Sequence, residues 1–225
     1  MKIAILQPYF FPFIGYWHLI KKVDKLIIYD DAQYMKSGWI NRNRFLLDGE
    51  LKYFSLPIKS VSSNRLISET SFILGKEKQI SRVKSQLAAA YKKMKFFNEM
   101  ENFFDETCAE DGWPDVAVYL SNVLKKSIFL LNINTTVTLS SDIKFDRSLS
   151  AQDKVLEMVG ALNGTEYVNP VGGQSLYETS AFTSQDIELK FTSNNLNING
   201  FMNCSKIPEV LDSISLEEVF QTFLQ

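Results

Sequence analysis

The sequence has few of the residues that build metal centres and disulfide frameworks. Its 225 residues include two cysteines, Cys108 and Cys204, and a single histidine, His18. The cysteines have no zinc-ligand spacing, and one pair is too few for a disulfide framework in a chain of this length. We therefore expect no structural metal site and a reducing, cytoplasmic location.

Long apolar runs and an excess of one charge are also missing. No apolar run reaches the roughly 18 residues that a membrane helix needs, because Lys21 and Lys22 close the N-terminal apolar stretch. That stretch contains two prolines and no small-residue cleavage site, which disfavours a signal peptide. The net charge is −2, from 24 basic and 26 acidic residues. The sequence thus predicts neither a membrane span nor binding of long nucleic acid.

Charge is nevertheless distributed unevenly along the chain. Residues 1–60 contain nine Lys or Arg and five Asp or Glu, which gives this segment a charge of +4. The other 165 residues must then carry −6. A small anionic ligand is therefore expected to bind within the first quarter of the chain.

Short apolar strands alternate with segments of helical periodicity. Residues 1–6 and 25–29 are typical of buried strands, and 16–23 has helical spacing, so this region predicts a βαβ unit with parallel strands. The same reasoning predicts further strands at 136–139, 166–170 and 187–191, a hairpin within 39–59 around Asp48-Gly49, and helices at 76–104, 113–131, 150–162 and 216–224. We expect Gly164 to stop the helix at 150–162.

The predicted fold is α/β, with a Rossmann-like parallel sheet flanked by helices, an inserted β-hairpin and a helical segment. We expect one domain over residues 1–225, with 76–131 as a helical covering segment or subdomain. Ligands of such sheets bind at the carboxyl ends of the strands, so the loops that follow the strands are the candidate site.

The loop after the first strand begins at Gln7 and leads into a helix. A glycine near the helix start lets backbone amides approach a ligand, and a helix N-terminus favours an anion. Gln7, Tyr9, Gly15 and Tyr16 are the candidate substrate contacts. The alternative is that the prolines and aromatic residues only pack the helix against the sheet.

The second predicted strand ends in two carboxylates, Asp30 and Asp31. Adjacent strand residues point to opposite faces, so we expect one of them to act as a general base while the other caps or pairs with Arg42 or Arg44. Which of the two faces the ligand is left open. Gln33 and Lys36 follow in the same loop as candidate contacts.

Two further segments carry polar residues suited to an anionic ligand. Asn and Arg alternate from Asn41 to Arg44, so the two Arg share one face of a strand, where each can bind phosphate or carboxylate in bidentate fashion. A solvated edge strand is the alternative. A glycine-rich loop follows the strand at 166–170, and we expect all these loops to converge in one pocket. The candidate contacts are Asn41, Arg42, Asn43, Arg44, Asn169, Gly172, Gly173, Gln174 and Tyr177.

Four motifs carry a resemblance to a known family. The segments IAILQPYFFPFIGYWHLI, YDDAQYMKSGWINRNR, YFSLPIK and YVNPVGGQSLY resemble the WbqC-like family, which is found among genes for bacterial O-antigen and capsule polysaccharides. The resemblance spans most of the chain. It implies a role in making or decorating surface polysaccharide, by modifying an amino sugar carried on a nucleotide.

A more distant resemblance is to nucleotidyltransferases of the pantothenate-synthetase and aminoacyl-tRNA-synthetase type. Their His-x-Gly-His motif would place histidines at Phe13 and Tyr16, on either side of Gly15, and both histidines are missing. Since those histidines stabilise the phosphates in the transition state, their loss argues against efficient nucleotidyl transfer. Nucleotide binding at the helix start remains compatible with the sequence.

Three hypotheses of function follow. The leading one is an enzyme that transfers a small acyl or aminoacyl group to the amine of a nucleotide-linked amino sugar. The alternatives are ATP-dependent adenylyl transfer to a carboxylate and a non-catalytic nucleotide-sugar binding subunit. The sequence identifies no cofactor, although a nucleotide with Mg²⁺ is compatible with it. The expected partner is a small molecule, either a nucleotide-linked sugar or an activated acyl donor, and a homodimer is left open.

Overall fold

The computed structural model describes residues 1–12, 14–48, 50–59, 64–73, 75–93, 97–108 and 115–192. Several features expected from the sequence lie outside this part of the chain. They are Phe13, Gly49 of the hairpin turn, the inter-helix turn at 111–114, Cys204 and the helix at 216–224.

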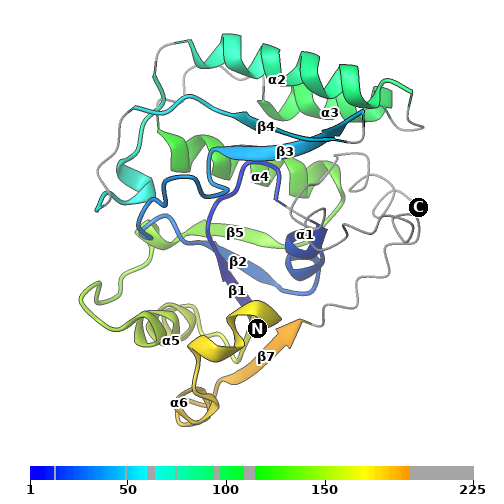
Figure 1. Cartoon of the computed structure of the whole chain (residues 1–225). Helices are drawn as coiled ribbons and strands as arrows, with labels where there is room; N and C mark the ends of the chain where they lie inside the picture. The colour runs from blue at the N-terminus through cyan, green and yellow to red at the C-terminus, as the bar shows by residue number, and fades with distance from the viewer. Residues whose placement is uncertain are drawn as a thin grey trace.

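Five parallel strands form the central sheet (Figure 1), in the order β5-β2-β1-β6-β7. They are β1 (Lys2–Leu6), β2 (Lys25–Ile28), β5 (Thr136–Leu139), β6 (Glu166–Pro170) and β7 (Glu188–Thr192). The predicted α/β class is thereby confirmed. The strands β5 and β6 flank the β2-β1 pair on opposite sides, so the chain between them crosses two strands.

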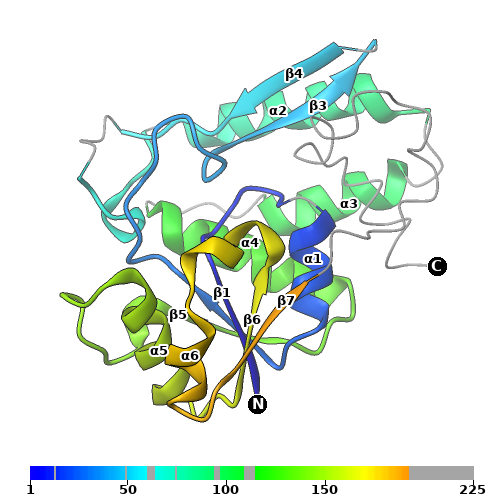
Figure 2. The same ribbon diagram turned by 60° about the horizontal axis from the view of Figure 1, so that its bottom comes forward.

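Alternate residues of the strands face helices on opposite sides of the sheet (Figure 2). Ile3, Ile5 and Ile27 pack with α5 (Ala151–Ala161) and α6 (Thr179–Thr183). On the other face Ala4, Leu26 and Ile28 pack with α1 (Ile14–Lys21) and with α4 (Val116–Leu130). Side chains of a strand alternate in direction, so uninterrupted apolar strands belong in a sheet covered on both faces.

The hairpin of β3 (Arg42–Leu47) and β4 (Glu50–Ser55) lies beyond the carboxyl ends of the sheet strands (Figure 1). It is attached to the loop after β1. The Phe10 amide donates to the Ile40 carbonyl at 3.1 Å, and the buried Asn43 side chain donates to the Phe10 carbonyl at 3.0 Å. Because the buried Asn43 amide donates to the carbonyls of both Phe10 and Phe11, it fixes the loop in place.

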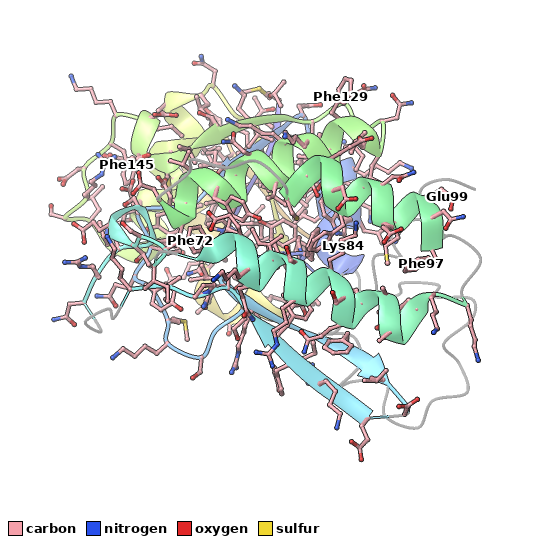
Figure 3. The ribbon with its side chains drawn as sticks, turned by 90° about the horizontal axis from the view of Figure 1, so that it is seen from above. Phe72, Lys84, Phe97, Glu99, Phe129 and Phe145 are labelled. Carbon is pink, nitrogen blue, oxygen red and sulfur yellow. The ribbon has the colours of Figure 1, made fainter. Side chains whose placement is uncertain are left out.

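Helix α2 (Lys76–Tyr91) packs on the hairpin, and α3 (Phe97–Cys108) packs against α2 and α4 (Figure 1). The sequence predicted one helix over 76–104, and the structure divides that span into these two. Lys84 of α2 reaches α3 (Figure 3), with ion pairs to Asp105 at 2.7 Å and to Glu101 at 3.5 Å. The hairpin, α2, α3 and the first half of α4 share one hydrophobic core. In the second half of α4, Leu124 and Ile128 pack on the sheet instead.

Short 3₁₀ turns complete the described elements: η1 (Ile67–Glu69), η2 (Ser140–Asp142) and η3 (Val171–Leu176). Within the described ranges, no helix has the length and apolar character required to cross a membrane.

The end of α5 differs in detail from the prediction. The left-handed residue there is Asn163, with φ 55°, and Gly164 follows it. Gly164 is required for a different reason, because a Cβ at this position would lie 2.6 Å from both Ile3 Cδ1 and Val159 Cγ1. The glycine lets the turn approach β1 closely.

Candidate functional site

The sheet order brings three of the predicted loops together. Because β2, β1 and β6 are neighbours and parallel, the residues after their carboxyl ends meet at one edge of the sheet (Figure 2). These residues are Gln7 after β1, Asp30 and Asp31 after β2, and Asn169 near the end of β6.

Asp30 is a buried carboxylate, and both of its oxygens accept hydrogen bonds from within the protein. It is 2% exposed. Its Oδ1 accepts from Ser140 Oγ at 2.8 Å and from the Ser141 amide at 3.0 Å, while Oδ2 accepts from Ser141 Oγ at 2.6 Å. Since these serines form η2 directly after β5, Asp30 fastens the end of β2 to the end of β5.

Asp31 has fewer internal bonds than Asp30, and its side chain is 10% exposed. Its Oδ2 pairs with Arg147 at 3.1 Å, and no other bond to its side chain is found among the described residues. The predicted pairing of one carboxylate with Arg42 or Arg44 is therefore wrong: Asp30 bonds to Ser140 and Ser141, and Asp31 pairs with Arg147. Arg147 is itself held over the Phe145 ring, 4.6 Å from its centroid, and within 3.5 Å of the Ser140 carbonyl.

Three tyrosines lie beside this pair. Burial raises the pKa of Tyr29, and the negative charge of Asp31 and the nearby Tyr177 raise it further against the opposing effect of Arg147. The Tyr167 hydroxyl lies 3.2 Å from the Tyr177 hydroxyl, and burial raises the pKa of Tyr167 as well. The phenols of Tyr29 and Tyr167 are therefore protonated at neutral pH and can donate hydrogen bonds.

Asn169 and the glycine-rich loop that follows β6 lie at the same edge of the sheet. This residue is 7% exposed and accepts from the Tyr167 hydroxyl at 3.2 Å. Gly173, in the 3₁₀ turn η3, packs directly on it: a Cβ at 173 would lie 2.1 Å from Asn169 Nδ2. A Cβ at Gly172 would meet nothing within 4 Å. We call Tyr29, Asp31, Arg147, Tyr167, Asn169 and Tyr177 the sheet-edge cluster.

The loop after β1 is shaped by its aromatic residues. The Tyr16 hydroxyl donates to the Gln7 carbonyl at 2.7 Å, and Tyr16 is 2% exposed. Burial, with a contribution from Tyr9, raises the pKa of Tyr16 well above its ordinary value. Tyr16 therefore serves to hold the loop. Gln7 and Tyr9 are partly exposed, so they are the residues of this loop that a ligand could reach.

The hairpin places the two arginines away from the sheet-edge carboxylates. The Arg42 guanidinium lies 5.5 Å from the Trp39 ring centroid and 5.1 Å from that of Tyr53, and Arg44 lies 4.9 Å and 5.8 Å from the same two rings. The two Arg thus share one face of β3, as the alternation predicted. Asn43, on the opposite face, holds the Phe10 carbonyl instead of facing the arginines.

A pocket of about 330 Å³ opens beside the hairpin. We call it the hairpin pocket, and its described lining residues are Tyr34, Lys36, Ser37, Asn41, Arg42, Ser55, Ile58 and Lys59. Three of the predicted contacts line it, namely Lys36, Asn41 and Arg42. Gln7, Asp31 and Asn169 are not among these lining residues. The structure thus places the predicted residues in two groups, in contrast to the single pocket expected.

The two groups are joined by a short segment. Residues 31–34 run from the sheet-edge cluster to the pocket wall, beside residues 65–67, where the Tyr34 amide donates to the Arg65 carbonyl at 2.8 Å. Gln33 is bridged to Leu66 in this pairing. Three residues span at most about 11 Å between the Asp31 and Tyr34 Cα atoms.

No cluster of three His, Cys, Asp or Glu residues suited to a metal ion occurs in the part of the chain that the structure describes. The chemistry of the two groups is instead that of one carboxylate, several phenols and a set of cations.

Comparison with known proteins decides the family. The model of the WbqC-like protein family matches residues 7–199, which is most of the chain. The chain belongs to the WbqC-like family.

A second comparison places this WbqC-like protein beside an uncharacterized protein of Mycobacterium tuberculosis (strain ATCC 25618 / H37Rv), Rv1507c. The two are 24% identical over 188 residues, which cover 84% of this chain and 80% of the relative. No solved structure matches the chain significantly. The resemblance drawn from the sequence motifs is confirmed at the level of the family.

Sequence reasoning missed several residues of these groups in the WbqC-like protein. Arg147 is separated from Asp31 by 116 positions, and its only local signal is its place shortly after the predicted strand at 136–139. Tyr29 is the last residue of the strand predicted at 25–29 and Lys59 the last of the hairpin segment predicted at 39–59, so both could have been nominated on that ground. Ser140 and Ser141 have no sequence signal that marks them as partners of Asp30.

Proposed function

We propose that this WbqC-like protein transfers a small acyl or aminoacyl group to the amine of a nucleotide-linked amino sugar, as a step of surface-polysaccharide biosynthesis in the cytoplasm. The observation that carries the proposal is the position of the Asp31 carboxylate and its pairing with Arg147. This carboxylate lies at the carboxyl edge of a parallel sheet, oriented by Arg147 and close to the protonated phenol of Tyr29.

Aminolysis of an acyl donor needs a base close to the amine. The amine nitrogen attacks the acyl carbonyl carbon, a C–N bond forms, and the bond from that carbon to the donor's leaving group breaks. An ammonium has no lone pair, so a proton must leave the nitrogen before or during attack. Because Arg147 occupies Oδ2 of Asp31, Oδ1 is the oxygen that would accept this proton.

The neighbouring groups suit the rest of the reaction. The carbonyl oxygen gains negative charge in the tetrahedral intermediate, and a hydrogen bond from the Tyr29 phenol could stabilise it. Gln7 and Tyr9 would contact one substrate on the β1 side, and Asn169 and the η3 turn would enclose the sugar on the β6 side. Adenylyl transfer is supported less well, because Tyr16, at the position of the second motif histidine, is buried and bonded to the Gln7 carbonyl.

The test uses the purified full chain with a panel of nucleotide-linked amino sugars and activated acyl or aminoacyl donors, and mass spectrometry detects the N-acylated sugar. Replacement of a general base typically costs 10²- to 10⁴-fold in rate, so Asp31→Asn is expected to lose about that much kcat/KM at unchanged thermal stability. The control is Asp142→Asn, an exposed carboxylate of the nearby η2 turn, which should retain full activity.

The Asp30→Asn variant distinguishes the structural role of Asp30 from the catalytic role proposed for Asp31. It replaces Oδ2, which accepts from Ser141 Oγ, with an amide nitrogen that only donates, while the two bonds to Oδ1 keep a neutral acceptor; we therefore expect a loss of about 1–3 kcal/mol of stability rather than a selective loss of rate. Unchanged kcat/KM in Asp31→Asn would refute the proposed base. Binding of nucleotide sugars with no product from any donor would instead favour a non-catalytic binding subunit.

A further inference from the structure

The hairpin pocket concentrates positive charge. Lys36, Arg42 and Lys59 line it from three separate segments: the loop after β2, the start of β3 and the segment after β4. Within the described ranges, none of the three forms an ion pair with a carboxylate. Three like charges around one cavity repel one another, so the pocket is electrostatically prepared for an anion.

Arg42 is held in place before any ligand arrives. Its guanidinium is close to the faces of both Trp39 and Tyr53, and its Nε atom is buried without a hydrogen-bond partner in the described part of the chain. The terminal nitrogens of the same guanidinium are the donors that can bind a phosphate in bidentate fashion. Cation–π contacts therefore fix the group that an anion would bind.

The uncharged wall of the pocket is also ordered. The Tyr34 hydroxyl donates to Asn41 Oδ1 at 2.6 Å, and Asn41 Nδ2 donates to the Leu56 carbonyl at 2.7 Å. Both ends of the Asn41 amide are thus bonded to protein groups, and Asn41 fixes the orientation of the buried Tyr34 in the pocket wall. The remaining polar lining consists of Ser37 and Ser55, whose hydroxyls are able to donate to an anion.

Size and charge favour phosphate over a simple carboxylate. Ligand pockets typically have volumes of about 300 to 1,000 Å³, so a pocket of about 330 Å³ holds a phosphorylated group of modest size. A carboxylate would neutralise a single cation of the three, whereas one phosphate monoester carries about −1.5 to −2 charges at pH 7. A diphosphate balances three cations better than either.

We propose that the hairpin pocket binds the diphosphate of a nucleotide-linked substrate, with Lys36, Arg42 and Lys59 as its counter-charges. This assignment rests on the proposed function for the identity of the substrate. The segment from Asp31 to Tyr34 is short enough, at about 11 Å or less, for one nucleotide-linked sugar to occupy the pocket and reach Asp31.

The test measures binding without any chemistry. Isothermal titration of the full chain uses a set of nucleoside diphosphates with different bases, together with pyrophosphate, a plain nucleoside and acetate. Lys36→Gln and Lys59→Gln are the informative variants, because both side chains are exposed and their loss should not impair folding. Lys52→Gln is the control, an exposed lysine of β4 that pairs with Glu50 and is not a described lining residue.

We expect each pocket variant to weaken the binding of diphosphates and pyrophosphate about tenfold, and the double variant further, with Lys52→Gln unchanged. Added salt should weaken the wild-type affinity and narrow the difference between wild type and variants. Diphosphate affinity that is the same in wild type and in both pocket variants would overturn the assignment. Dependence on Lys59 seen for acetate but not for pyrophosphate would overturn it too.

The outcome is separable from that of the acyl-transfer proposal. If Lys59→Gln loses diphosphate binding and no donor is ever transferred, the pocket assignment holds and the proposed reaction fails. If N-acylated product forms and Lys59→Gln has an unchanged KM for the nucleotide sugar, the reaction holds and the pocket assignment fails.

Discussion

The contact between Gly173 and Asn169 provides a sharp test of the glycine loop. A methyl group at 173 would place Cβ 2.1 Å from Asn169 Nδ2, far inside van der Waals contact. Because Asn169 is 7% exposed and bonded to Tyr167, its amide cannot move aside without losing that bond. Loss of a buried hydrogen bond together with overpacking costs about 1–3 kcal/mol.

Gly172 supplies the matched control, since it precedes Gly173 in the same 3₁₀ turn and a Cβ there would meet nothing within 4 Å. We expect Gly173→Ala to lower the unfolding free energy by about 1–3 kcal/mol, and the melting temperature by about 2–4 °C per kcal/mol in a chain of this size. Gly172→Ala should stay within about 0.5 kcal/mol of wild type. Urea and thermal unfolding of both variants measure the difference.

A double-mutant cycle tests the cause. In an Asn169→Ala background the atom that the new methyl group would strike is gone, so Gly173→Ala should cost markedly less than in the wild-type background. Equal destabilisation by Gly172→Ala and Gly173→Ala, or an unchanged cost of Gly173→Ala after removal of Asn169, would refute the proposed packing of the loop.

Two further predictions concern stability and thiol reactivity. Gly164→Ala should lower the unfolding free energy by about 1–3 kcal/mol, because its Cβ would lie 2.6 Å from Ile3 and Val159, whereas Gly160→Ala, with nothing within 4 Å, should raise it by up to about 1 kcal/mol; chemical denaturation compares the two. Burial raises the pKa of the Cys108 thiol to about 12, so in a Cys204→Ser background an aromatic disulfide reagent at pH 8 should label a thiol only after denaturation, and rapid labelling of the folded protein would contradict this. Because the folded state keeps this thiol protonated, its contribution to stability should be complete below the unfolded pKa of about 8.5 and decline as the pH rises towards 12.

Much of the fold could be predicted from the sequence because the signals involved are local. Apolar runs such as Ile3–Leu6 define a strand covered on both faces, and Gln7-Pro8 ends it, all within a few residues. The alternation of Asn and Arg predicted that Arg42 and Arg44 share a face, which their common contact with Trp39 and Tyr53 agrees with. The start of the helix predicted at 150–162 is also a local signal, because the Ser150 side chain caps α5 by accepting from the Asp153 amide.

By itself, the sequence determined the strands, their parallel direction and the loops that carry the polar residues, since short-range periodicity and turn chemistry specify these. Only the tertiary structure decided the strand order, the hydrogen bonds from Ser140 and Ser141 to Asp30 across 110 and 111 positions, and the meeting of Lys36, Arg42 and Lys59 at one pocket. Partners so distant in the chain are selected by the packing of the whole core, and no local pattern of residues encodes that choice.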